Sequence, residues 1–219
     1  MTRGTPKRIF YGVELVDKDL TICLDALRFL AEPQYYRRSH VTVRGPYERA
    51  LSKKTLSTIN STFEERFRSV VIGSPISFFF GKQNTVVLPC EIPGIRDVWK
   101  KPDYSDGIAH ITLYDGKSRR DAEALLYILK KYRWHIIAKT TAIQKLDTKI
   151  DPLEDLLHVI HIIQQSPLLK TEVMGEDDLV DISKLSLLGR TIYIDRICHL
   201  VQRKFTVKKF GGSFDAEIS

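Results

Sequence analysis

Two stretches of this sequence, seventy residues apart, share a pattern of histidine, apolar residue, threonine and second apolar residue. They are His40-Val41-Thr42-Val43 and His110-Ile111-Thr112-Leu113. Because successive side chains of a β-strand point to opposite faces, the histidine and threonine of each stretch share one face and the apolar residues share the other. The pattern therefore predicts two half-buried strands. If they face each other, they place two imidazoles and two hydroxyls around one small volume.

This repeated pattern, in this order and spacing, resembles the paired motifs of the two-histidine (2H) phosphoesterase superfamily. That superfamily includes RNA 2′,5′-ligase-like proteins, 2′,3′-cyclic nucleotide phosphodiesterases, RNA-trimming exonucleases and phage enzymes that cleave cyclic oligonucleotides. The resemblance covers residues 9–147, and Ala109 stands where many relatives have a proline. It implies a duplicated fold of two similar lobes around a cleft, with one His-x-Thr strand from each lobe.

Two imidazoles and two hydroxyls suit the cleavage of a phosphodiester. One neutral histidine can remove a proton from the nucleophile while a protonated one gives a proton to the leaving oxygen. Hydroxyl groups can donate to the phosphate oxygens. We therefore expect His40 and His110 to act as the acid/base pair, in either assignment, and Thr42 and Thr112 to bind the phosphate. The scheme requires no metal and no cofactor.

Several side chains near the motif strands are candidates for substrate binding. Arg44 lies two residues after Thr42 and shares its strand face, where it could contact phosphate or stay a solvated charge. Aromatic side chains that flank the motif strands or precede His110 could stack on a base, and packing within the fold is the alternative for each. These are Tyr36, Tyr47, Tyr114, Trp99 and Tyr104.

The charge of the chain divides near residue 150. Residues 1–150 contain 26 Lys and Arg against 16 Asp and Glu, a net charge of +10, whereas residues 151–219 contain 8 against 11, a net charge of −3. A basic body suits an anionic partner such as RNA or a small nucleotide, or is only a solvated surface. No apolar run approaches the ~18 residues of a membrane span, so no membrane partner is expected. Three widely spaced cysteines match no metal or redox motif and indicate reduced thiols in a cytoplasm; they are Cys23, Cys90 and Cys198.

Hydrophobic periodicity favours an α+β fold with antiparallel sheets and helices on the outside. Apolar spacing is mainly helical after residue 150. Residues 1–150 are therefore expected to form the bilobal domain and residues 151–219 a helical C-terminal extension, which could pack on the body, act as a lid or form a dimer contact. Strands are predicted at 8–16, 37–43, 76–80, 85–88 and 108–113, an extended segment at 134–146, and helices at about 19–30, 52–67 and 121–132.

The sequence therefore predicts a metal-independent phosphodiesterase that acts on RNA ends, 2′,3′-cyclic phosphates or small oligonucleotides, either cyclic or 2′–5′ linked. One alternative is a non-catalytic nucleic-acid or nucleotide-binding module that uses the same cleft. A second is an interaction protein in which the acidic extension binds the partner. His158 and His161 have a helical spacing compatible with a metal, but no cysteine or acidic ligand is clearly placed beside them.

Overall fold

The computed structural model describes residues 8–35, 37–64, 69–80, 82–98, 108–146 and 152–207. Within these ranges the strands form one antiparallel sheet in the order β7-β3-β5-β6-β2-β1-β8, and β4 also pairs with β5. The two motif strands, β2 and β6, are therefore direct neighbours near the middle of the sheet. The strands are β1 Ile9–Val13, β2 Val41–Tyr47, β3 Ser69–Ile72, β4 Ile76–Phe80, β5 Gln83–Glu91, β6 His110–Gly116, β7 Ile136–Lys139 and β8 Gln144–Leu146.

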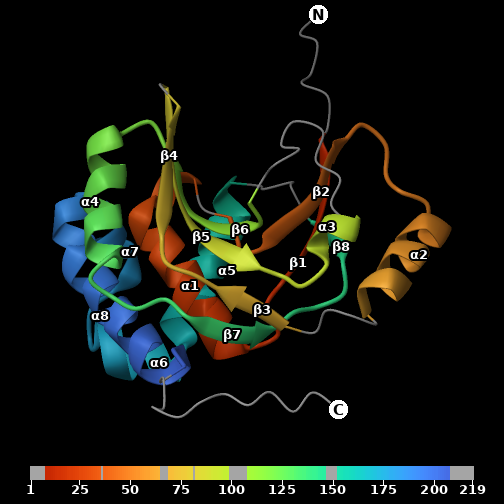
Figure 1. Cartoon of the computed structure of the whole chain (residues 1–219). Helices are drawn as coiled ribbons and strands as arrows, with labels where there is room; N and C mark the ends of the chain where they lie inside the picture. The colour runs from red at the N-terminus through yellow and green to blue at the C-terminus, as the bar shows by residue number, and fades with distance from the viewer. Residues whose placement is uncertain are drawn as a thin grey trace, which may run out of the picture.

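The longer helices are grouped on one side of the sheet, and α2 stands apart from them (Figure 1). Helix α1 packs against β6, α4 packs against β5, and α8 packs against both α1 and α4. This arrangement leaves the other face of the central strands without these three helices. The helices are α1 Lys18–Ala31, α2 Lys53–Glu64, α3 Ile95–Val98, α4 Arg119–Leu129, α5 Pro152–Gln165, α6 Pro167–Leu169, α7 Leu179–Lys184 and α8 Leu187–Phe205; a 3₁₀ turn at Pro33–Tyr35 and a π turn at Lys170–Met174 complete the described elements.

Helix α1 fixes the sheet face that lies opposite the motif side chains. Asp17 caps its first turn by accepting a hydrogen bond from the Leu20 backbone N–H at 3.0 Å. Its apolar side chains are buried, apart from the half-buried Ile22, and the side chains of Arg28 and of the C-cap residue Glu32 reach β6. The Arg28 guanidinium donates to the Thr112 carbonyl oxygen at 3.0 Å, and a Glu32 carboxylate oxygen accepts from the Asp115 backbone N–H at 3.1 Å. These polar contacts fix the helix at a defined position along the second motif strand.

Residues 152–207 are mainly helical, as predicted, and they share the hydrophobic core of the body. Buried side chains of α5, α7 and α8 belong to the same continuous cluster as those of the sheet and α1. Arg190 of α8 is itself buried and donates through Nε to the Leu30 carbonyl oxygen of α1 at 2.6 Å. The acidic extension therefore packs on the body and covers α1, which is one of the three arrangements that the sequence left open.

The predicted α+β class with antiparallel strands is confirmed. The described strands form one sheet, and the predicted duplication into two lobes stays a prediction. Neither the short helix α3 nor the strand β3 was indicated by the apolar pattern. Segment 191–194, which is ambiguous in sequence between helix and strand, lies inside α8. Ser186 is the N-cap of α8, because its side chain accepts from the Gly189 backbone N–H.

Candidate functional site

The four motif side chains come together because β2 and β6 pair in one register. Val41 lies opposite Ile111 in this antiparallel pair, and both are buried. Antiparallel geometry then places Thr42 beside His110 and His40 beside Thr112, on the face opposite Val41 and Ile111. All four side chains are half-buried on that face. The structure thus brings the two sequence motifs to one place, as neighbours in one sheet. We call these four residues the motif face.

Both histidines are held by the backbone in the same way. Nδ1 of His40 lies 2.8 Å from the Arg38 carbonyl oxygen, and Nδ1 of His110 lies 2.6 Å from the Ile108 carbonyl oxygen. Because a carbonyl oxygen only accepts, Nδ1 must carry the hydrogen in each ring. The contact with the carbonyl oxygen two residues earlier therefore selects the Nδ1–H tautomer in both histidines. Nε2 is then the nitrogen that can exchange a proton with a substrate.

The environment of His40 disfavours its charged form. Burial is the main cause, and the positive charge of Arg28 is the next; together they lower the pKa of His40 to about 4. The backbone contact to Arg38 acts in the opposite direction but is weaker, and His110 also lies close enough to lower the pKa of His40. His40 is consequently a neutral imidazole at physiological pH, which is the protonation state of a general base.

A bulge in β6 turns Tyr114 away from the motif face. Thr112 pairs with Val87 of β5 whereas Tyr114 pairs with the preceding Val86, so one extra residue is inserted at Leu113. The extra residue changes which face the later side chains occupy. Tyr114 is buried and donates its hydroxyl to the Ser118 carbonyl oxygen at 3.1 Å. Of the two readings that the sequence left open for Tyr114, this geometry favours packing within the fold over stacking on a base, because the ring is buried and strict alternation does not hold across the bulge.

The prediction that Arg44 shares the strand face of Thr42 by simple alternation does not hold, because Thr42 pairs with Gly12 of β1 whereas Arg44 pairs with the adjacent Tyr11, so one extra residue is inserted at Val43. The protein orients the Arg44 guanidinium. Nε donates to the Tyr47 hydroxyl at 3.2 Å, and Nη1 donates to the Val98 carbonyl oxygen at 2.7 Å. Two of the five N–H groups that an arginine carries are thus used within the protein. Tyr47 also packs edge-on against Tyr11, with ring centroids 6.1 Å apart. Tyr47 therefore holds Arg44 in place, and base stacking by Tyr47 is not what this geometry favours.

Three of the predicted aromatic contacts, Tyr36, Trp99 and Tyr104, lie outside the described residues. An aromatic side chain that we did not predict does reach the motif face. Phe78 of β4 lies with its ring centroid 6.5 Å from that of His110, at an interplanar angle of 52°. The apolar run at 76–80 indicates a strand, but only the pairing of β4 with β5 brings Phe78 to this histidine.

Gly12 allows the first motif strand to approach β1 closely. It lies opposite Thr42 in the β1–β2 pair. A Cβ at residue 12 would collide with the Val41 carbonyl oxygen and would come within 2.9 Å of the Leu146 side chain. A glycine is therefore required here for close approach, and its absent side chain leaves Thr42 without a bulky lateral neighbour on the β1 side.

The cysteines and the metal-ligating residue types form no second chemical site in the part of the chain that the structure describes. No group of three or more His, Cys, Asp and Glu residues there could hold a metal ion. The three cysteines are buried and unpaired with each other. Burial raises the pKa of Cys23 and Cys90 to about 12 and also raises that of Cys198. These thiols are therefore protonated and packed, as expected of reduced structural cysteines.

Among the described helices, none has the length and apolar character needed to cross a membrane. Comparison of the chain with protein-family models, with curated proteins and with solved structures found no match.

Proposed function

We propose that this protein is a metal-independent phosphodiesterase whose motif face performs general acid/base catalysis. The observation that supports this most is the register of β2 and β6, combined with the repeated Nδ1 contact. That combination aligns two imidazoles of the same tautomer and two hydroxyls on one surface. The resemblance of both motifs to the 2H phosphoesterase superfamily supports the same class of reaction.

The four groups occupy the corners of a rectangle in which like groups are diagonal. His40 is opposite Thr112, and Thr42 is opposite His110, so the two histidines are diagonal neighbours across the strand pair. Diagonal neighbours in an antiparallel pair are about 7–8 Å apart, which leaves room for one phosphate between the rings. Acid and base on opposite sides of the phosphorus suit in-line displacement, and the two threonine hydroxyls can donate to the non-bridging oxygens.

The roles of the two histidines follow from their surroundings. His40 is neutral at physiological pH because its pKa is lowered to about 4. We therefore propose His40 as the base that removes a proton from the attacking hydroxyl or water, and His110 as the acid that protonates the leaving oxygen. Both proton transfers are carried by side chains of the motif face, so the scheme needs no metal ion.

The substrate class that suits this face is an RNA end, a 2′,3′-cyclic phosphate or a small oligonucleotide, cyclic or 2′–5′ linked. The net charge of +10 on residues 1–150 favours such an anion. The Phe78 ring beside His110 offers a stacking surface for a base next to the scissile phosphate. A cytoplasmic location, which the reduced cysteines favour, belongs to the same proposal.

The predicted duplication into two similar lobes is also part of the proposal. An antiparallel pair centred on Val41 and Ile111 relates its two strands by a local two-fold axis. That axis exchanges the two motifs, and each histidine has the same backbone partner two residues earlier. Such local symmetry supports an origin from two like units.

The direct test is incubation of the protein with a substrate panel, with products identified by mass spectrometry. The panel contains 2′,3′-cyclic mononucleotides, 2′–5′ and 3′–5′ oligonucleotides and cyclic dinucleotides. His40→Ala and His110→Ala should each reduce kcat at least about 10²-fold, because each removes one proton transfer. His161, which is exposed, provides the matched control, and His161→Ala should leave turnover unchanged.

The same variants separate the enzyme from a binding module. The alternative predicts no turnover of any panel member by the parent protein and unchanged affinity in the His40→Ala/His110→Ala double variant. Full activity in either single variant would remove that histidine from the mechanism.

A further inference from the structure

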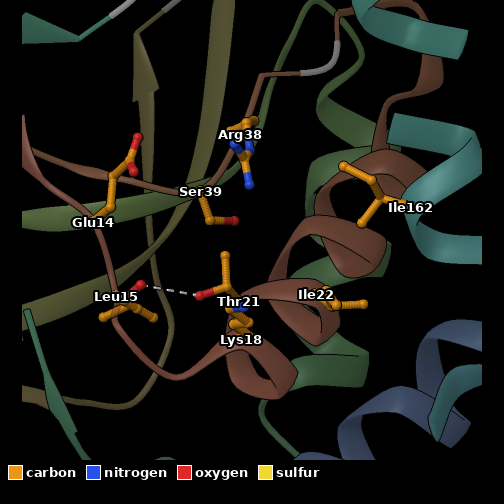
Figure 2. A pocket seen from close by; sticks show the side chains of 8 residues that line it. All are labelled: Glu14, Leu15, Lys18, Thr21, Ile22, Arg38, Ser39 and Ile162. Atoms are coloured by element: carbon orange, nitrogen blue, oxygen red, sulfur yellow. Dashed lines mark hydrogen bonds between the residues drawn. The ribbon is translucent and has the colours of Figure 1, made fainter. Parts of the chain in front are cut away.

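A hollow that is distinct from the motif face lies between the start of α1, the segment before β2 and helix α5 (Figure 2). Its volume is about 230 Å³. That is smaller than the 300–1,000 Å³ typical of sites for drug-sized ligands, so its occupant must be a small molecule. No residue of the motif face lines it. The lining residues are Glu14, Leu15, Lys18, Thr21, Ile22, Arg38, Ser39 and Ile162.

Ser39 lines this hollow, and its hydroxyl is buried and unsatisfied. The residue is only 2 % exposed, and its Oγ has no hydrogen-bond partner among the described residues. Figure 2 shows the hydroxyl pointing into the space between Arg38, Thr21 and Ile162. Buried hydroxyl groups in folded proteins nearly always have a partner, so the Ser39 hydroxyl requires a water molecule or a ligand group to complete its hydrogen bonding.

The neighbouring hydroxyl cannot serve as that partner. Thr21 donates to the Asp17 carbonyl oxygen at 2.7 Å and is also 3.4 Å from the Leu15 carbonyl oxygen. Its methyl group is therefore the part directed toward Ser39 in Figure 2. The side chains lining this hollow that can donate hydrogen bonds to a ligand are therefore Ser39 and the basic residues.

Arg38 retains donors for a ligand. The Asp25 Oδ2 lies 3.9 Å from Arg38 Nε, which is a long ion pair. Asp25 instead uses Oδ1 to accept from the Ser39 backbone N–H at 2.6 Å. The Arg38 side chain is 58 % exposed, and Figure 2 shows its guanidinium turned toward the Ser39 hydroxyl.

The remaining lining sets the chemistry of the occupant. Lys18 adds a second positive charge and Glu14 one negative charge, so the polar part of the lining is net positive. Leu15, Ile22 and Ile162 supply aliphatic surface beside it. A basic group, an unsatisfied hydroxyl and an aliphatic wall in one small hollow are complementary to a short amphipathic anion.

We propose that this hollow binds a small organic anion, with its anionic head on Ser39 and Arg38 and a short aliphatic part against Leu15, Ile22 and Ile162. The head is a carboxylate or a phosphate, both of which accept hydrogen bonds from a hydroxyl and a guanidinium. The inference stands apart from the proposed phosphodiesterase activity. It adds a ligand site directly before the first motif strand, since Arg38 also supplies the carbonyl oxygen that holds His40.

The test is an NMR titration of the isotope-labelled full chain with four probes: pentanoate, butyl phosphate, inorganic phosphate and 1-pentanol. We expect saturable shifts of the Ser39, Arg38 and Thr21 amides with pentanoate or butyl phosphate, and at least about tenfold weaker binding of 1-pentanol, which lacks the charge. The affinities for pentanoate and butyl phosphate decide between the two head groups. The difference in affinity between butyl phosphate and inorganic phosphate measures the contribution of the aliphatic part.

Variants locate the binding. Arg38→Met should lower the affinity for the more tightly bound anion at least about tenfold, and Ser39→Ala should lower it several-fold. Arg37→Met, a change at an exposed neighbour, should leave the affinity unchanged. The His40→Ala/His110→Ala double variant should still bind, which separates this hollow from the motif face. Ser39→Ala should also raise the Tm of the ligand-free protein, because it removes the unsatisfied hydroxyl. The proposal is overturned if no anion gives saturable shifts at these amides, or if the double histidine variant abolishes binding.

Discussion

The lowered pKa of His40 predicts a specific loss of stability in mild acid. The unfolded chain binds a proton at His40 below about pH 6.5, whereas the folded chain binds it only below about pH 4. Between these values the unfolded state holds more protons, so the free energy of unfolding decreases as the pH is lowered from 6.5 to 4. Below pH 4 and above pH 6.5 this group contributes no further change.

The size of the effect follows from the same shift. One pKa unit corresponds to about 1.4 kcal/mol. The fall from 6.5 to about 4 therefore gives a loss of about 3 kcal/mol of stability from His40 alone between neutral pH and pH 4. Against a typical stability of about 5–15 kcal/mol, this is a large fraction and easily measured.

The assay compares the parent protein with His40→Gln in urea at several pH values. Other groups titrate in both proteins, so the difference in unfolding free energy between parent and variant isolates His40. The unfolding free energy of the parent, relative to that of His40→Gln, should therefore decrease by about 3 kcal/mol as the pH is lowered from 7 to 4. NMR titration of the His40 ring measures its pKa directly. For any substrate found, kcat/KM should decrease on the acid side with a midpoint near pH 4, where the base becomes protonated.

Substitutions of Arg28 test the cause of the lowered His40 pKa. The positive charge of Arg28 is the second cause of the lowered pKa. Arg28→Met should therefore raise the pKa of His40 towards its ordinary value, whereas Arg28→Lys keeps the charge and should change the pKa less. Parallel stability curves for the parent and His40→Gln, with a ring pKa near 6.5, would refute both the neutral state of His40 in the fold and its assignment as the base.

Four further predictions concern the motif face and the packing around it. Thr42→Val and Thr112→Val should each cost about 1–3 kcal/mol of transition-state stabilisation, less than loss of a histidine, as measured by kcat/KM. Activity should persist in EDTA; loss on chelation with rescue by zinc or manganese would indicate a metal site. Gly12→Ala should lower the free energy of unfolding by about 1–3 kcal/mol in urea and reduce activity, because the added methyl group displaces Val41 next to Thr42; unchanged stability would mean that β1 yields easily. Deletion of residues 151–219 should yield aggregated protein, judged by gel filtration, because it exposes the apolar faces that α8 covers on α1 and α4; a monodisperse, folded truncation would contradict the shared core.

The sequence predicts the motif face well because that face depends on local alternation. His40 and Thr42 share a face, and Val41 is buried beneath them, since two-residue periodicity is a property of any strand. The same holds for His110, Thr112 and Ile111. The resemblance implies one motif strand from each of two lobes around a cleft. The direct pairing of the two strands in one sheet, and the register that places each histidine beside the other threonine, come only from the structure.

The details that the sequence does not predict depend on contacts between distant segments. The bulge at Leu113 leaves no composition signal, so alternation places Tyr114 on the wrong face. Arg28 looks like a surface charge in sequence, yet its position on the buried side of α1 brings it to the Thr112 carbonyl oxygen. The hollow beside Ser39 exists only because Ile162 of the extension packs near the segment before β2.

The local two-fold symmetry of the motif face has a consequence for the direction in which a nucleic-acid strand can lie. Four groups related by such an axis cannot distinguish the 5′ side of a phosphate from its 3′ side, so polarity must be read by the surroundings. These differ: His110 lies opposite Pro89 of β5 and near the Phe78 ring, whereas Thr42 lies opposite Gly12, which has no side chain. One side of the phosphate therefore lies next to bulky side chains, and the other lies next to a position without a side chain. A strand that enters with its base against Phe78 would be committed to one orientation, and thus to one leaving oxygen.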